Sequence, residues 1–318
     1  MVTRPPRVPS ALGAALGVLS DARFGEPPFE PHPVAVFGSA MTDFEHRHYD
    51  GSRAAGAIHA AVGLGIGVAA GRGVRRATGS AVVATAAATA LAVAGRGLAN
   101  AALDVAAALD ADDLDAARAA LPSLVGRDPR ALDQADIARA VVESVAENTV
   151  DAVVAPACWA ALAGPAGALG YRAVNTMDAM VGHRSARYAE YGWASARLDD
   201  AANWVPARLT AGLVAIVRPA AAGAVVRAVH RDAPAHPSPN SGVAEAAFAA
   251  ALGLQLGGPS RYGDRVETRP LLGDGAAPGP LDIGRAVTLA SDVGLALAAL
   301  LTALGSVQAA RRWGRARR

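Results

Sequence analysis

Acidic side chains recur at helical spacing in the segment E-S-V-A-E-N-T-V-D, residues 143–151. Glu143, Glu147 and Asp151 follow one another at intervals of four residues, so a helix would place all three on one face. Carboxylates in such a stripe repel one another unless a cation or an arginine lies among them. Carboxylate oxygens, together with an amide such as Asn148, suit Mg²⁺, which prefers hard oxygen ligands. The segment therefore predicts a magnesium site, and a solvated acidic helix face is the alternative.

Amide and acidic side chains also share a helix face in Y-R-A-V-N-T-M-D-A-M-V-G-H-R, residues 171–184. Asn175 and Asp178 are three residues apart, and they precede His183 and Arg184. An imidazole can act near neutral pH as an acid, as a base or as a hydrogen-bond donor to phosphate. The segment predicts a catalytic group at Asp178 or His183, and a histidine with a purely structural role is the alternative.

Paired carboxylates stand between two arginines in R-L-D-D-A-A-N-W-V-P-A-R, residues 197–208. The polar residues of interest here are Arg197, Asp199, Asp200, Asn203 and Arg208. Carboxylates hold a metal ion and arginines bind phosphate oxygens, so the combination fits a metal–phosphate complex. A helix end closed by ordinary salt bridges is the alternative.

Three other features carry a weaker signal. The loop H-P-S-P-N-S-G, residues 236–242, consists of turn-forming residues that can aim backbone amides at an anion. His46 and His48 are close enough to suggest a pair of metal ligands, although a surface loop is the simpler interpretation. Cys158 is the sole cysteine and stands in an apolar stretch, which predicts a small core residue.

Arginine supplies all 30 of the basic Lys and Arg residues, because the sequence contains no lysine. This excludes a P-loop, whose lysine contacts the phosphates, and it excludes Schiff-base catalysis. Any phosphate must therefore be held by arginine, by backbone amides or by a metal ion. The net charge of +2 gives no support to nucleic-acid binding.

The sequence is more apolar than most soluble domains, with 52% hydrophobic residues, 18% charged residues and a mean hydropathy of +0.25. An alanine-rich soluble helical protein is the alternative to a membrane protein. Apolar stretches that approach the ~20 residues of a membrane-spanning helix lie at about 54–71, 78–95, 152–170, 207–229 and 286–304. The sequence shows no long strand pattern. It therefore predicts an all-α, polytopic integral membrane protein in which residues 1–318 form a single membrane-embedded domain.

Polar regions are expected between the apolar helices. Polar catalytic regions are predicted at about 96–151, which has helical periodicity, and at 171–206, which is dense in Arg, Asp, Asn and Trp. A Pro/Gly-rich loop region with short helices is predicted at 230–285. The basic sequence R-G-V-R-R, residues 72–76, is expected to be a turn that joins the first two apolar helices into a hairpin.

Motifs in the same order along the chain resemble those of the adenosylcobinamide-phosphate synthases, the CobD/CbiB family. The resemblance runs from about residue 12 to 304. Besides the four polar segments above, it comprises D-A-R-F-G-E-P with H-P-V (21–34), R-G-L (96–98), L-V-G-R-D (124–128), E-A-A-F-A-A-A-L-G and L-G-G-P. In the first motif, Glu26 keeps the acid that many relatives carry in a G-D-P run.

This resemblance implies a multi-pass enzyme of the cell membrane that acts late in the corrin pathway, beside other membrane enzymes of that pathway. It would attach (R)-1-amino-2-propanol, or its O-phosphate, to the free carboxylate of adenosylcobyric acid with hydrolysis of ATP. An intramembrane Mg²⁺-dependent prenyltransferase, or a non-catalytic membrane transporter or signalling protein, would explain polar residues in an apolar chain. Neither would explain the resemblance along the whole chain.

Phosphoryl transfer needs positioning of the reactants and neutralisation of charge, usually by Mg²⁺ and arginine. The candidate residues are therefore assigned the following roles. Mg²⁺–ATP is expected at Glu143, Glu147, Asp151, Asp199 and Asp200. Asn148, Asn175 and Asn203 would orient the ligands, Arg184, Arg197 and Arg208 would hold phosphates, and Asp178 or His183 would take a proton from the attacking ammonium.

The last expectation concerns topology. Since ATP is cytoplasmic, residues 143–151 and 197–208 should both face the cytoplasm, so residues 152–170 should not cross the membrane. The pair Gly164-Pro165 should break a helix in this segment, which predicts a re-entrant or protein-buried element.

Overall fold

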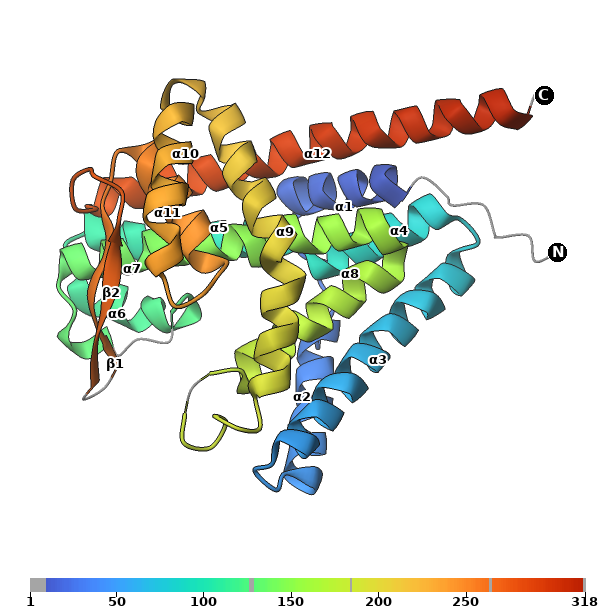
Figure 1. Cartoon of the computed structure of the whole chain (residues 1–318), viewed down its shortest axis with the longest axis horizontal. Helices are drawn as coiled ribbons and strands as arrows, with labels where there is room; N and C mark the ends of the chain where they lie inside the picture. Colours follow the sequence, from blue (N-terminus) through green and yellow to red (C-terminus); the bar gives the residue numbers. More distant parts are fainter. Residues whose placement is uncertain (1–9, 126–128, 184, 263–264, 317–318) are drawn as a thin grey trace. The chain divides into compact units, whose positions relative to one another are not determined.

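The computed structural model describes residues 10–125, 129–183, 185–262 and 265–316 (Figure 1). Helices make up 79% of it, which confirms the all-α prediction. The chain separates into two compact units, each assembled from several stretches of sequence. The first unit draws on residues up to 94, on 155–202 and on residues from 297, and the second on 95–154 and 203–296. The prediction of a single domain stays a prediction.

The first unit is a bundle in which α3 and α8 pack against each other and α1 packs on both α4 and α8. Its helices are α1 (Ser10–Phe24), α2 (Pro33–His48), α3 (Arg53–Thr78), α4 (Ala81–Ala92) and α8 (Ala155–Val181), with the beginning of α9 (Trp193–Val217) and the end of α12 (Pro280–Ala316). Small residues allow the close packing: Ala14 and Ala15 of α1, for example, are completely buried.

The second unit packs α7 and the β-hairpin around α11. Its elements are α5 (Gly95–Asp110), α6 (Leu114–Ala120), the short turns η1 (Leu121–Ser123) and η2 (Pro129–Ala131), α7 (Gln134–Thr149), the π-helical turn η3 (Val150–Val154), η4 (Pro219–Ala221), α10 (Ala222–Arg231), η5 (Ala233–Ala235), α11 (Ser241–Leu252), β1 (Leu256–Tyr262) and β2 (Arg265–Leu272). The remainder of α9 and of α12 belongs to this unit.

Four helical stretches of the described chain are long and apolar enough to cross a membrane: Arg53–Thr78, Ala81–Asp110, Gln134–Val181 and Pro280–Val307. The predicted segments 54–71, 78–95, 152–170 and 286–304 lie largely within them. The predicted segment 207–229 is not one straight helix, because the chain bends by 112° between Trp193–Val217 and Pro219–Ala235. Pro219 explains the break, since proline disfavours helical backbone at the residue before it.

The predicted turn at residues 72–76 was wrong. These residues lie inside α3, which continues to Thr78. Arginine is a good helix former and a lone glycine does not end a helix. The chain turns instead at Gly79, whose φ of 65° suits glycine, and Ser80 then caps α4 by accepting the N–H of Val83.

Glycines on one face of α3 bring it close to α8. A Cβ added at Gly67 would lie 2.5 Å from the carbonyl oxygen of Leu169, and one at Gly71 would lie 2.3 Å from that of Pro165. Both distances are too short for any side chain. The two backbones therefore touch along a seam that only glycine permits.

Helix α8 folds back on itself at Gly164, where the backbone leaves helical geometry (φ 65°, ψ −148°) just before Pro165. The fold-back is tight, since a Cβ added at Gly167 would lie 2.1 Å from the carbonyl oxygen of Trp159. In a straight helix these residues would be about 12 Å apart along the axis. Figure 1 shows the two arms of α8. The predicted break at Gly164-Pro165 is confirmed.

The antiparallel hairpin β1–β2 was not expected within the predicted loop region 230–285. It carries an irregularity between Leu256 and Gly258, where Gly257 and Gly258 both have positive φ. Glycine suits these two positions because a residue with a Cβ rarely adopts a positive φ. The hairpin matters because its first strand contacts α7 and α11.

Candidate functional site

Two carboxylates of α7 are tied to elements from elsewhere in the second unit. Glu143 is 2% exposed, and its Oε1 accepts the N–H of Gly257 in β1 at 2.8 Å. One turn later, Glu147 Oε1 accepts the hydroxyl of Ser241 at 2.6 Å. Both side chains thus face the protein interior, and the solvated acidic face is not what α7 presents at these two positions.

The loop H-P-S-P-N-S-G forms a tight polar turn at the start of α11. Ser238 Oγ accepts the N–H of Ser241 at 3.1 Å and that of Asn240 at 3.3 Å. Its own hydroxyl lies 3.1 Å from Ser241 Oγ and can donate to it, because the single Ser241 proton goes to Glu147. His236 Nδ1 accepts the N–H of Ser238 at 3.1 Å. The loop therefore holds the Ser241 hydroxyl in place against Glu147.

Arg208 of α9 joins the same group of residues. Its Nη1 donates to Asn240 Oδ1 at 2.9 Å and to the carbonyl of Trp204 at 3.1 Å, and its guanidinium lies 4.6 Å from the centre of the Trp204 ring. Both hydrogen bonds use one nitrogen, which leaves Nε and Nη2 available to an anion. Asn148 instead turns its amide group toward its own helix, donating to the carbonyl and hydroxyl of Ser144.

His236 and Glu245 belong to this polar cluster and were not predicted as a pair. They are 9% and 0% exposed, and His236 Nε2 lies 3.7 Å from Glu245 Oε1, which is too long for a hydrogen bond. Burial is the main influence that holds the pKa of His236 below its ordinary value, and the Glu147 and Glu143 carboxylates oppose it. The sequence signal was present: Glu245 is the one charged residue in the otherwise apolar S-G-V-A-E-A-A-F-A-A-A-L.

Two further predicted residues of the second unit are Asp151 and Asn203. Asp151 lies beyond the end of α7 in the π-helical turn η3, so the three predicted acidic residues do not share one regular helix. The wider π-turn changes the direction of its side chain relative to that of Glu147. Asn203 is 2% exposed on α9.

The first unit holds the other predicted residues. Asn175 of α8 donates to Asp199 Oδ1 of α9 at 3.3 Å and accepts from Arg172 Nη1 at 3.2 Å. Asp199 is 9% exposed, while Asp200 is half-buried and Arg197 is exposed. The predicted third and second polar segments therefore meet at Asn175 and Asp199.

The predicted catalytic groups Asp178 and His183 lie at and just beyond the end of α8. The Asp178 carbonyl accepts the N–H of Gly182, which ends the helix. His183 is exposed, with its ring centre 5.0 Å from that of Tyr188. Arg184 lies outside the described residues.

A family model described as the CobD/CbiB protein matches residues 14–290 of the chain. The chain belongs to the CobD/CbiB family. It is 49% identical over 301 residues to the cobalamin biosynthesis protein CobD of Mycobacterium tuberculosis (strain H37Rv), covering 92% of this chain and 95% of that protein. The protein of the same name in Pelobacter propionicus is 40% identical over 315 residues, covering 92% and 97%. The Rhodobacter capsulatus protein of that name is 50% identical over 186 residues, covering 58% and 59%.

Membership of the CobD/CbiB family supports a role in cobalamin biosynthesis, and the apolar helices fit a multi-pass membrane protein. No solved structure matches the chain significantly.

The CobD/CbiB sequence motifs thus lie in both units. Glu143, Glu147, Asn148, Asp151, Asn203 and Arg208 belong to the second unit, and Asn175, Asp178, His183, Arg197, Asp199 and Asp200 to the first. Over the described chain, no three His, Cys, Asp or Glu side chains form a group that could hold a metal ion.

Proposed function

We propose that the chain joins (R)-1-amino-2-propanol, or its O-phosphate, to the free carboxylate of adenosylcobyric acid with hydrolysis of ATP. The observation that carries the proposal is the similarity to a cobalamin biosynthesis protein over 92% of the chain. The buried carboxylates and the tethered arginine described above supply groups that such a reaction needs.

The chemistry explains why ATP is consumed. A carboxylate does not react with an amine, because the oxygen that must leave is a poor leaving group. In the proposed sequence, the substrate carboxylate attacks the γ-phosphorus of ATP and releases ADP, giving an acyl phosphate. The neutral amine then attacks the acyl carbon, the amide bond forms, and inorganic phosphate leaves with the electron pair of the broken C–O bond. The amine loses one proton to a base.

The structure favours particular residues of the second unit for the phosphate end of this reaction. With no lysine in the chain, Arg208 is a candidate to bind a phosphate through Nε and Nη2, while Nη1 stays on Asn240. The Ser241 hydroxyl and the Gly257 N–H hold Glu147 and Glu143 through one oxygen each. The second oxygen of Glu147 could meet a metal ion without breaking that bond.

Magnesium bound with ATP would neutralise the charge on the phosphate oxygens. Glu143, Glu147, Asp151, Asp199 and Asp200 remain the proposed ligands, of which one or two would be used together with the nucleotide. Asn148, Asn175 and Asn203 remain the proposed orienting amides, and Arg184 and Arg197 the further phosphate ligands. Asp178 or His183 is proposed to accept the amine proton. The site is proposed to face the cytoplasm, where ATP is found.

Purified protein in lipid nanodiscs tests this proposal when it is supplied with adenosylcobyric acid, ATP, Mg²⁺ and either amine. Mass spectrometry should detect the amide product, and ADP should form only when the corrinoid is present. Glu147→Gln and Asp199→Asn should each reduce turnover by at least about a hundredfold, since the loss of a metal ligand removes charge neutralisation. Asp115→Asn, at an exposed ion pair with Arg118, is the matched control and should be fully active.

Absence of product with both amines would refute the proposed reaction. ADP formation without a corrinoid requirement would favour a different ATP-hydrolysing membrane protein, such as a transport protein. Full activity of Glu147→Gln and Asp199→Asn would leave the proposed reaction standing, but it would show that Glu147 and Asp199 are not metal ligands.

A further inference from the structure

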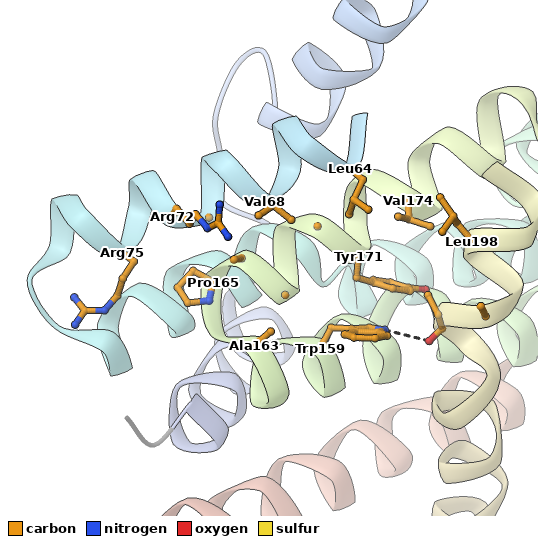
Figure 2. A pocket seen from close by; sticks show the side chains of 16 residues that line it. Leu64, Val68, Arg72, Arg75, Trp159, Ala163, Pro165, Tyr171, Val174 and Leu198 are labelled. Carbon is orange, nitrogen blue, oxygen red and sulfur yellow. Dashed lines mark hydrogen bonds between the residues drawn. The ribbon is translucent and has the colours of Figure 1, made fainter. Parts of the chain in front are cut away.

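A groove of about 730 Å³ runs along α3 in the first unit, between α3, the two arms of α8 and the beginning of α9. Figure 2 shows its residues from close by. Its walls include Leu64 and Val68 of α3, Trp159 and Tyr171 of α8, and Leu198 of α9. None of the polar residues Asn175, Asp178 or Asp199 lines it. The groove is therefore a feature separate from the polar site proposed above.

The groove has a strongly unequal distribution of charge along its length. Arg72 and Arg75 stand at one end, whereas Leu64, Val174 and Leu198 surround the other end (Figure 2). Among the described residues, neither arginine forms an ion pair with a carboxylate. Arg72 and Arg75 thus lie about one helical turn apart at one end of an apolar groove, and neither has a described carboxylate as a partner.

The length of the groove matches the thickness of one lipid leaflet. From Leu64 to Arg75, α3 rises by about 16 Å at 1.5 Å per residue. Half of a bilayer's hydrocarbon core is about 15 Å. Helix α3 is itself one of the helices long and apolar enough to span a membrane, and its arginines lie near the end of that helix. Arginines at such a position place their charges at the headgroup level.

Small residues keep the groove open. The small residues that line the groove are Gly71, Ala163, Ala166, Gly167, Gly170, Ala201 and Ala202. The fold-back of α8 at Gly164 creates this surface, because it sets the first arm beside the second. The Trp159 indole donates to the carbonyl of Ala202 at 3.1 Å, which fixes the far wall in place.

We propose that this groove binds an anionic phospholipid, with the lipid phosphate between Arg72 and Arg75 and one acyl chain lying along α3 toward Leu64. A phospholipid complements the groove, because its negative phosphate lies at the membrane surface and its hydrocarbon chains lie below. Basic pockets between membrane helices recognise lipid headgroups in this way. The proposal does not depend on the reaction proposed above.

The protein in nanodiscs of equal parts phosphatidylglycerol and phosphatidylcholine tests the proposal by native mass spectrometry after stepwise delipidation. The last lipid retained by the wild-type chain should be phosphatidylglycerol, by about thirtyfold over phosphatidylcholine, which is about 2 kcal/mol at 1.36 kcal/mol per factor of ten. The double variant Arg72→Gln/Arg75→Gln should lose this preference. Arg76→Gln is the matched control, because Arg76 is exposed on the same turn but does not line the groove, and it should keep the preference.

A second variant tests the acyl-chain part of the groove without touching the arginines. Ala201 is exposed and borders the channel, so Ala201→Phe should fill it and reduce retention of phosphatidylglycerol at least about tenfold. Circular dichroism and gel filtration identify folded variants, and only these are compared.

Four results would overturn the proposal. Equal retention of both lipids by the wild-type chain would mean that the retained lipids surround the protein unspecifically and that the groove does not select an anionic lipid. Unchanged retention in the double arginine variant would remove the arginines from the binding site, and an equal loss in Arg76→Gln would mean unspecific surface charge. Displacement of phosphatidylglycerol by millimolar inorganic phosphate would identify a site for a free anion rather than a lipid.

Discussion

The glycine seam between α3 and α8 makes a quantitative prediction about stability. In Gly67→Ala, the new methyl group would lie 2.5 Å from the Leu169 carbonyl oxygen and 2.7 Å from the Ala173 Cβ. Restoring ordinary contact distances requires the facing backbone to move by roughly 0.9 Å, and overpacking of this kind costs about 1–3 kcal/mol. Alanine also favours a helix over glycine, by up to about 1 kcal/mol.

Gly65→Ala is the matched control, because Gly65 lies two residues away on the same helix and has nothing within 4 Å of its added Cβ. The gain in helix propensity is the same in both variants. The difference between their free energies of unfolding therefore isolates the cost of overpacking, and it should be about 1–3 kcal/mol with Gly67→Ala the less stable.

Unfolding by sodium dodecyl sulfate in mixed micelles, followed by far-ultraviolet circular dichroism, measures this difference. Equal free energies for the two variants would show that α3 and α8 are not in contact at Gly67. A destabilised Gly65→Ala would show that the opposite face of α3 is covered.

Three further predictions concern the polar cluster of the second unit. Arg208→Lys should raise the KM for ATP at least about tenfold, because lysine cannot contact two phosphate oxygens and Asn240 together as a planar guanidinium can; unchanged kinetic constants would place Arg208 outside the site. Ser241→Ala removes the 2.6 Å hydrogen bond to Glu147 and should lower stability by about 1–3 kcal/mol, whereas Ser123→Ala, at an exposed serine, should have little effect. Burial lowers the pKa of His236, so the unfolded chain binds a proton more readily than the folded chain as the pH falls below about 6.5. Stability should then decline below that pH, and the decline should be smaller in His236→Asn; an identical pH profile would contradict a neutral buried imidazole.

The sequence was sufficient to predict features that depend on residues within a single helix. Apolar runs predicted α3 and α12, and Gly164-Pro165 predicted the break in α8, because each depends on residues adjacent in the chain. The extent of α3 was missed at Arg75 and Arg76, since charge was read as a turn although arginine is compatible with a helix.

Long-range contacts could not be predicted in the same way. Glu143 meets Gly257 across 114 residues and Glu147 meets Ser241 across 94, and no periodicity connects such positions. The hairpin β1–β2 was also missed, because its Gly-Gly-Pro sequence is typical of loops and only the partner strand makes it a strand. The sequence also did not predict that the polar segments would be divided between two units.

The topology of α8 supports the last prediction. A straight helix of the 48 residues from Gln134 to Val181 would be about 72 Å long, well beyond the ~40–45 Å of a whole bilayer, and its ends would lie on opposite sides. The fold-back at Gly164 instead returns the second arm alongside the first. Residues before and after α8 should therefore be on the same side of the membrane, as the proposed cytoplasmic site requires.

Single cysteines in sealed vesicles test this, with Cys158 first replaced by serine. Ala135→Cys, near the start of α7, and Ala189→Cys, after α8, are both exposed, and an impermeant thiol reagent should reach them from the same side. Ala77→Cys provides the contrast. Helix α3 has 26 residues and is about 39 Å long, and its beginning is joined to the segment after α8 by the ion pair between Arg53 and Glu190. Position 77 should thus react from the side opposite to position 189. Labelling of positions 135 and 189 from opposite sides would mean that α8 crosses the membrane once, and it would contradict the expectation that residues 143–151 and 197–208 both face the cytoplasm.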